Sequence, residues 1–170
     1  MYENWKVKRW QTIISDYPRI QMVSLIDNGK LNIKLQIISG KDVGKRFSIS
    51  FKNYPAYRNI LEEYRLELWN KYNTTENNLG STWIVSNSPW INELESNEPL
   101  LKEFSPQLIH YVICTEDDVI EVLSNSPPVI VELKHSSSTN KFPGKSIVYY
   151  HPGDKDQISK LLQKYKKQTK

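Results

Sequence analysis

The segment Ile109 to Leu133 constrains the fold of this chain more than any other. It contains three stretches rich in Val and Ile, separated first by the acidic turn Thr115–Asp118 and then by Pro127-Pro128. Short β-rich stretches bounded by turn residues predict antiparallel strands with tight connections. Because almost none of these side chains is reactive, we interpret the segment as scaffold with an acidic edge.

The first third of the chain predicts a helix followed by a three-stranded meander. Apolar residues at spacings of three and four predict a helix over residues 4–16. Strands are predicted at Ile20 to Ile26, Lys30 to Ile38 and Lys45 to Phe51, and Asn28-Gly29 favours a type I′ turn between the first two. The second strand alternates apolar and polar residues, so one face of the sheet is expected to be buried.

The rest of the chain predicts further helices and strands. Tyr57 to Tyr72 has apolar residues at helical spacing, which predicts an amphipathic helix on the sheet. Thr82 to Val85 is a predicted short strand, and Ser88-Pro89 supplies the N-cap and first-turn residues of another helix. Ser146 to Tyr150 predicts a last strand before a terminal helix.

Together these patterns predict an α+β fold, a mainly antiparallel sheet (meander) with amphipathic helices packed on it. The length of 170 residues fits a single domain, 1–170. We expect the meander to continue into the strands from Leu108 to Leu133. The Ser-rich stretch predicts a mobile loop over 135–145, and the lysine-rich end predicts a disordered basic tail over 165–170.

The cysteine content and the chain start indicate a compartment. Cys114 is the single cysteine of the sequence, so no internal disulfide can form, and a reducing compartment is favoured. The start MYENWKVKRW lacks the apolar core of a signal peptide, and no stretch approaches the ~18 apolar residues of a membrane span. We therefore expect a cytoplasmic protein.

The charges are strongly segregated along the chain. Counting Lys and Arg against Asp and Glu gives +6 for residues 1–53, −8 for residues 54–134 and +6 for residues 135–170, which agrees with the net charge of +4. These blocks either neutralise one another in the fold or leave an acidic face that attracts a basic partner.

Candidate catalytic and metal-binding residues do not form a pattern. His110 and Cys114 are four apart in a predicted strand, about 13 Å, which is too far for a nucleophile and its base. The acidic turn has neither an EF-hand pattern nor a nearby histidine, and Gly40 to Lys45 lacks the spacing of a phosphate loop. We expect no catalytic residue, no metal and no cofactor.

Seven carboxylates of the acidic middle are predicted to lie in loops or at element ends, where rigid scaffolds usually present binding groups. These predicted partner-binding residues are Glu93, Glu95, Glu98, Glu116, Asp117, Asp118 and Glu121. The partner expected from their charge is a protein with a basic surface.

Two alternatives remain open. The basic ends could bind a nucleic acid through phosphate contacts and aromatic stacking, with Lys6, Lys8, Arg9 and Trp10 at one end and Lys164, Lys166, Lys167 and Lys170 at the other. An enzyme whose site is assembled from distant residues is the other alternative.

Several motifs together carry a resemblance to a known class. They are FKNYPAYRN with LEEYRLELW (Phe51 to Trp69), WIVSNSPWINEL (Trp83 to Leu94) and HYVICTEDDVIEVLSNSPP (His110 to Pro128). Over residues 15–134 the chain resembles small bacterial α+β immunity proteins encoded beside polymorphic toxins. The resemblance implies a non-catalytic antitoxin that neutralises a cognate toxin by direct binding, and it assigns no binding residue.

Overall fold

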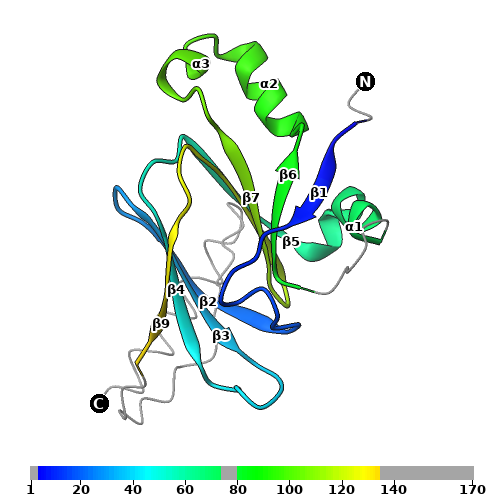
Figure 1. The fold of residues 1–170 in the computed structure, drawn as a ribbon, viewed down its shortest axis with the longest axis vertical. Helices are drawn as coiled ribbons and strands as arrows, with labels where there is room; N and C mark the ends of the chain where they lie inside the picture. The colour runs from blue at the N-terminus through cyan, green and yellow to red at the C-terminus, as the bar shows by residue number, and fades with distance from the viewer. Residues whose placement is uncertain (1–3, 74–79, 135–170) are drawn as a thin grey trace, which may run out of the picture. The chain divides into compact units, whose positions relative to one another are not determined.

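Two antiparallel sheets make up the described part of the chain, residues 4–73 and 80–134 of a computed structural model (Figure 1). These residues all belong to one compact unit that ends at Ser137. The predicted α+β class is confirmed. The predicted loop at 135–145, the strand Ser146 to Tyr150, the terminal helix and the tail at 165–170 lie outside the described residues.

The four-stranded sheet contains the predicted meander. Its spatial order is β2-β3-β4-β9, with bounds Ile20–Asp27, Leu31–Ile37, Arg46–Phe51 and Val129–Leu133. Alternate residues of β3 are buried, as its sequence pattern predicts. The β2–β3 connection differs from the prediction, because the register pairs Asp27 with Leu31 and only Gly29 of the loop has a positive φ, +85°. The loop therefore has three residues and is not a type I′ turn.

The five-stranded sheet has the order β1-β6-β7-β8-β5. Its strands are β1 (Lys6–Arg9), β6 (Thr82–Ser86), β7 (Ile109–Cys114), β8 (Asp118–Ser124) and β5 (Ala56–Leu61). The helices are α1 (Leu66–Asn73), α2 (Pro89–Asn97) and the short α3 (Leu101–Phe104), with a 3-10 turn at Glu62–Tyr64. The prediction that the meander continues through β7 and β8 is wrong, since only β9 of that segment joins the meander sheet.

The predicted helix over residues 4–16 is wrong. β1 occupies part of this segment and pairs with β6, with Val7 opposite Val85. Val7 and Ile14 are buried, but Val7 lies in the strand and Ile14 in the turns that follow it. Hydrogen bonds between Thr12 and Ser15 hold these turns. Pairing with a strand about 75 residues away outweighs the local helical spacing.

The predicted helix from Tyr57 to Tyr72 is wrong over its first half. β5 pairs with β8 along its length, and the helix α1 begins only at Leu66. Arg58 lies directly opposite Glu121 in this pairing. The ion pair between Arg58 and Glu121 therefore favours a strand here, although the apolar spacing favours one continuous helix.

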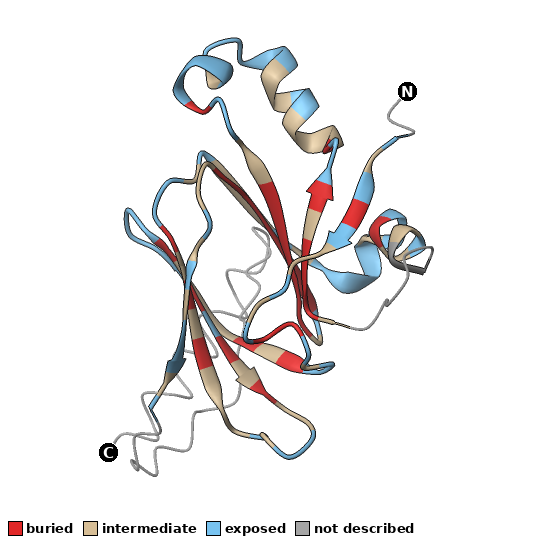
Figure 2. Cartoon of the chain, in the orientation of Figure 1, coloured by how far each residue is buried: buried red, intermediate tan, exposed pale blue. Residues whose placement is uncertain are grey.

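Two hydrophobic clusters lie on the two faces of the five-stranded sheet. One is shared with the four-stranded sheet and joins β3 and β4 to Tyr111, Ile113, Ile120 and Val122. The other lies under α1 and contains Leu68, Trp83, Val85 and Val112 among its members. Figure 2 shows the buried residues concentrated in the central strands of both sheets. None of the helices in residues 4–73 and 80–134 is long and apolar enough to cross a membrane.

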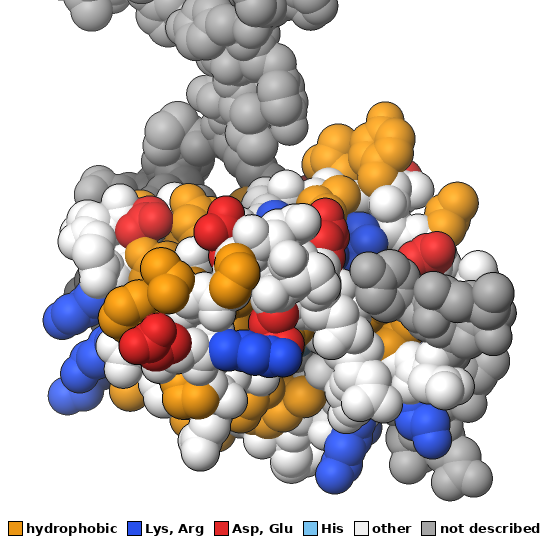
Figure 3. Space-filling view, turned by 90° about the horizontal axis from the view of Figure 1, so that it is seen from above, with side chains coloured by type: hydrophobic (Ala, Val, Ile, Leu, Met, Phe, Trp, Pro, Cys, Tyr) orange, Lys and Arg blue, Asp and Glu red, His pale blue; other side chains and the backbone are white. Residues whose placement is uncertain are grey.

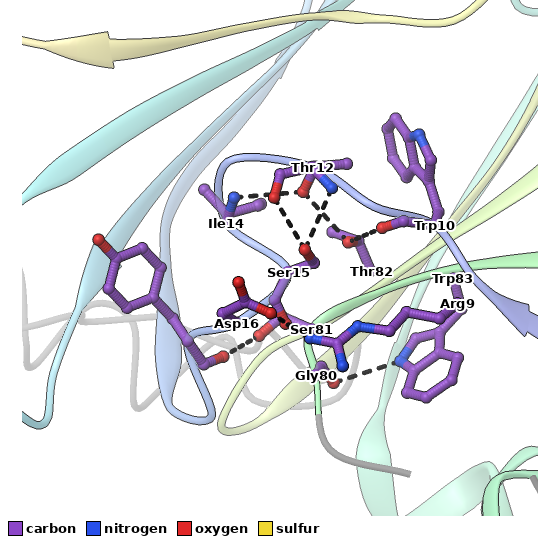
Figure 4. A network of polar contacts seen from close by, with 11 residues as sticks. Arg9, Trp10, Thr12, Ile14, Ser15, Asp16, Gly80, Ser81, Thr82 and Trp83 are labelled. Carbon is purple, nitrogen blue, oxygen red and sulfur yellow. Dashed lines mark hydrogen bonds and ion pairs between the residues drawn. The ribbon is translucent and has the colours of Figure 1, made fainter. Parts of the chain in front are cut away.

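A polar network attaches the turn after β1 to β6 (Figure 4). Arg9 pairs with Asp16 and donates from Nη2 to the carbonyl oxygen of Ser15 at 3.2 Å. The Thr82 hydroxyl donates to the carbonyl oxygen of Trp10 at 2.7 Å. Gly80 lies against this turn, where a Cβ would be 2.8 Å from the Ser15 carbonyl oxygen.

Gly80→Ala is expected to destabilise the protein more than Gly40→Ala. Both glycines have positive φ, +149° and +85°, but a Cβ at Gly40 meets nothing within 4 Å. The backbone penalty alone is about 1 kcal/mol, and the clash at Gly80 adds on the order of 1 kcal/mol or more. Urea unfolding of both variants measures the difference, and equal losses would contradict this close packing.

Candidate functional site

The seven predicted partner-binding carboxylates do not form one surface. Three lie on or just after α2, which precedes β7, and the others lie in the β7–β8 turn or in β8. A six-residue strand spans about 20 Å, so α2 and the β7–β8 turn are at opposite ends of β7. The structure therefore offers two separate acidic groups, and each is described in turn.

The first group belongs to a surface that combines carboxylates with exposed apolar side chains. We define the α2–α3 surface as Glu93, Glu98, Leu100, Glu103 and Phe104. All three glutamates are exposed, and the exposed fractions of Leu100 and Phe104 are 63% and 74%. Figure 3, which views the molecule from the end where α2 and α3 lie, shows acidic and apolar side chains beside one another.

The sequence explains how this surface is held. Ser88 caps α2 as predicted, since its Oγ accepts from the Ile91 N–H at 3.2 Å and Pro89 follows it. Lys102 neutralises Glu95 through an ion pair of 3.1 Å. Among the residues described, Glu93, Glu98 and Glu103 have no ion-pair partner, so their charges face solvent.

The second group is less available than the sequence predicts. Glu116 pairs with Arg19 through two contacts, one of them 2.9 Å from Arg19 Nε to Oε2, and this pair lowers the pKa of Glu116. Asp117 is exposed. The prediction that Asp118 faces a partner is wrong. Only 3% of the surface of Asp118 is exposed, and its Oδ1 accepts a hydrogen bond from Asn59 Nδ2 at 3.0 Å.

The prediction that Glu121 faces a partner is also wrong. Glu121 lies in the middle of β8 and has 0% exposed surface. Arg58 Nε donates to its Oε2, and Arg65 Nη2 donates to its Oε1. Burial raises the pKa of Glu121, but the His110 ring and the Arg58 guanidinium outweigh burial and bring the pKa down to about 2. The carboxylate is ionised inside the protein.

His110 links this buried cluster to α2. Its Nδ1 is 2.8 Å from the Ser88 Oγ, and its Nε2 is 3.7 Å from Glu121 Oε2, too long for a hydrogen bond. Burial lowers the pKa of His110, although Glu121 acts in the opposite direction. We therefore assign a neutral ring near pH 7. The proton is best placed on Nε2, where the N–H points toward the carboxylate, while Nδ1 accepts from the Ser88 hydroxyl.

Ser88, His110 and Glu121 form a serine–histidine–carboxylate series that the sequence does not predict. The geometry does not suit nucleophilic catalysis, because Ser88 is 3% exposed and its Oγ is engaged by the Ile91 N–H. Cys114 is also buried in the cluster under α1. Within residues 4–73 and 80–134, no group of three His, Cys, Asp or Glu side chains is placed to hold a metal ion.

A cavity of about 160 Å³ lies between α1 and α2. Arg58, Arg65 and His110 line it, together with Trp5 and Trp90. The exposed residues Glu67 and Glu93 also belong to the lining. The Arg58 guanidinium lies 4.2 Å from the centre of the Trp90 ring, and that ring packs edge-on against His110.

The basic N-terminal segment does not present its aromatic residue for stacking. Trp10 packs against Tyr111, with ring centroids 4.8 Å apart, and Arg9 is engaged by Asp16. Lys6 and Lys8 are exposed on the edge strand β1. The C-terminal lysines lie outside the described residues.

Sequence reasoning misses Arg58 and Arg65, since both fall in the segment whose spacing predicts a continuous helix. One signal could have found them. Glu121 stands between Ile120 and Val122 in a strand rich in Val and Ile, and a carboxylate buried there requires a cationic partner. No family model, curated protein or solved structure matches this chain.

Glu121→Gln is expected to lower the free energy of unfolding by about 3 kcal/mol, because it leaves Arg58 and Arg65 without their shared counter-charge. Glu116→Gln is the matched control. It breaks a pair with the exposed Arg19, and we expect a much smaller loss because solvent screens that pair. Chemical denaturation compares the two, and similar losses would show that the Glu121 cluster is not a buried ionic core.

The Glu121→Gln effect is expected to depend on pH. Because the pKa of Glu121 is about 2 in the folded protein and 4.5 in the reference state, its ionisation stabilises the fold above pH 4.5. This contribution is about 3 kcal/mol at pH 7 and is lost as the pH falls toward 2, reaching roughly half at pH 3. The difference in unfolding free energy between wild type and Glu121→Gln should therefore be smaller at pH 3 than at pH 7. An unchanged difference would mean that Glu121 is not ionised in the fold.

Proposed function

We propose that this protein is a non-catalytic binding protein that neutralises a bacterial toxin by direct contact, as an immunity protein does. The observation that carries the proposal is the α2–α3 surface, where two large apolar side chains are mostly exposed among carboxylates without ion-pair partners in the described residues. Exposed aromatic and aliphatic anchors with a charged rim are typical of protein-binding sites.

The energetic argument concerns Leu100 and Phe104. Leaving such side chains in water forgoes roughly 1.5–3 kcal/mol each, which a partner pocket recovers by burying them. Both side chains lie on or beside the four-residue helix α3, where they do not contribute to the two hydrophobic clusters of the described residues. Their exposure therefore favours a role in binding over a role in folding.

The charge of the same surface favours a basic partner. From Glu93 to Phe104 the chain has four glutamates and one lysine, and that lysine is engaged by Glu95. The net negative charge of this segment steers a basic protein toward the apolar anchors and raises the association rate at low salt. A nuclease-like toxin, which needs a basic surface for its substrate, fits this description.

The other readings receive less support. The serine, histidine and carboxylate nearest to one another are buried, and Ser88 is held as a helix cap, which disfavours an enzyme. At the basic N-terminal end, Trp10 is partly buried and packs against the core and the Tyr111 ring, so it does not offer a free stacking face for bases.

The experiment first expresses the genes that neighbour the gene of this protein and selects a product that is toxic to the cell. Co-expression is expected to restore growth of cells that produce the toxin, and surface-bound toxin is expected to bind the purified chain. Phe104→Ala should weaken the complex by about 2 kcal/mol, mainly through faster dissociation. The double reversal of Glu98 and Glu103 to Lys should slow association and flatten its dependence on ionic strength.

Asp117→Lys is the control, because Asp117 is exposed at the other end of β7. It is expected to leave binding and growth rescue unchanged. If Asp117→Lys weakens the complex while the α2–α3 variants do not, the β7–β8 turn is the binding surface and the α2–α3 assignment fails. Absence of both rescue and binding would refute the antitoxin function itself.

A further inference from the structure

Three of the four edge strands in the described sheets have features that discourage pairing with another chain. These strands are β1, β5 and β2. β1 presents the exposed lysines Lys6 and Lys8. β5 has Arg58 in its middle, directed inward to the buried Glu121, and the register of β2 on β3 shifts after Met22. Charged side chains and irregular registers are common means by which soluble proteins protect sheet edges.

The fourth edge strand, β9, lacks this protection. It begins with Val129, Ile130 and Val131, and its one charged residue is Glu132. β9 lies at the outside of the four-stranded sheet (Figure 1), and within the described fold it pairs with β4 alone. The exposed fractions of Val129 and Val131 are 56% and 46%. An exposed apolar edge strand of this kind is a template for a further strand.

The outward face of the sheet indicates which side chains a further strand contributes. Val129 and Val131 lie opposite Ser50 and Ser48 of β4, on the face away from the buried Phe47. The outward residues of β3 are polar as well. The two valines are therefore an apolar strip at the rim of a polar face. A strand with apolar residues at alternate positions covers such a strip.

We propose that β9 is a self-association surface, at which a second copy of this chain pairs its own β9 antiparallel to the first. β9 has the required pattern, because Val129, Val131 and Leu133 share the outward face. Two identical antiparallel strands are related by a two-fold axis, which gives a closed dimer and not an open chain of molecules. The four-stranded sheets of the two copies then form one continuous sheet.

The sequence of β9 selects one register for this pairing. With the two-fold axis at Val131, every residue of the strand is paired, and Val129 lies opposite Leu133 of the second copy. An axis at Glu132 places two carboxylates directly opposite each other, which is unfavourable. An axis at Ile130, or at either end of the strand, pairs fewer residues. In the selected register the two Glu132 side chains are diagonal neighbours, and because Glu132 is exposed, water screens their repulsion.

The dimer is expected to be weak and independent of toxin binding. One pair of short strands is a small interface compared with those of permanent dimers, so the association should be reversible. β9 shares no residue with the α2–α3 surface. Either proposal can therefore fail without the other.

The test is sedimentation velocity of the full chain from micromolar to submillimolar concentration. The wild type is expected to show a reversible monomer–dimer equilibrium with a Kd in the micromolar range. Val131→Lys places two lysines opposite each other, and it should raise the Kd about tenfold or more. Val43→Lys is the matched control, because Val43 is 58% exposed in the loop between β3 and β4. It should leave the Kd unchanged.

A second pair of variants keeps the test valid if Val131→Lys does not fold. Residues directly opposite each other on antiparallel strands are close enough for a disulfide. Oxidised glutathione should therefore cross-link Val131→Cys chains faster than Val43→Cys chains. The native Cys114 is buried and does not compete.

Four results overturn the proposal. The first is a wild-type chain that stays monomeric over the whole concentration range. The second is a folded Val131→Lys variant with the Kd of the wild type, and the third is equal cross-linking of Val131→Cys and Val43→Cys. The fourth is an assembly that grows beyond the dimer with concentration, because a two-fold pairing of β9 is closed.

Discussion

Glu121, in the middle of β8, is the centre of a buried ionic cluster with Arg58, Arg65 and His110. A lone carboxylate buried there would cost several kcal/mol, so its position requires the two arginines that pair with it. Arg58 comes from the edge strand β5 and Arg65 from the turn before α1, and the carboxylate therefore holds both segments against the sheet. His110 extends the network through Ser88 to α2, a helix without any fully buried residue. Polar contacts thus help to position α2, whose apolar residues are only partly buried.

The parts of the fold that could be predicted are those encoded by neighbouring residues. Alternation in β3, the acidic turn between β7 and β8, and the Ser88 cap all act over a few residues, and each forms where the sequence indicates. The two wrong helices both contain edge strands, β1 and β5. Their partners β6 and β8 lie far away in sequence, and short amphipathic segments satisfy helical spacing and strand alternation at once. Only the tertiary pairing decides between them.

The candidate site was predictable in the same limited sense. A count of charges finds the acidic middle, but it does not distinguish a carboxylate that balances an internal arginine from one that faces water. Glu121 and Asp118 became structural, and Glu116 and Glu95 are engaged by Arg19 and Lys102. The two interpretations of the segregated charge, internal neutralisation and an acidic face, therefore each apply to some of the residues. Part of the acidic block neutralises basic groups within the described fold, and another part, which includes the exposed glutamates of α2 and α3, is left to solvent.

The helix α2 contributes residues both to the cavity between α1 and α2 and to the α2–α3 surface. Its first turn supplies Pro89 and Trp90 to the cavity, and its last turn leads into Leu100 and Phe104. Since α2 is attached mainly through Ser88, His110 and the Arg58–Trp90 contact, its orientation depends on the Glu121 cluster. By thermodynamic linkage, any interaction that stabilises the first turn of α2 on the sheet also stabilises the arrangement of its far end. We therefore expect a loss of the Glu121 ion pairs to loosen the exposed apolar residues of α3 as well.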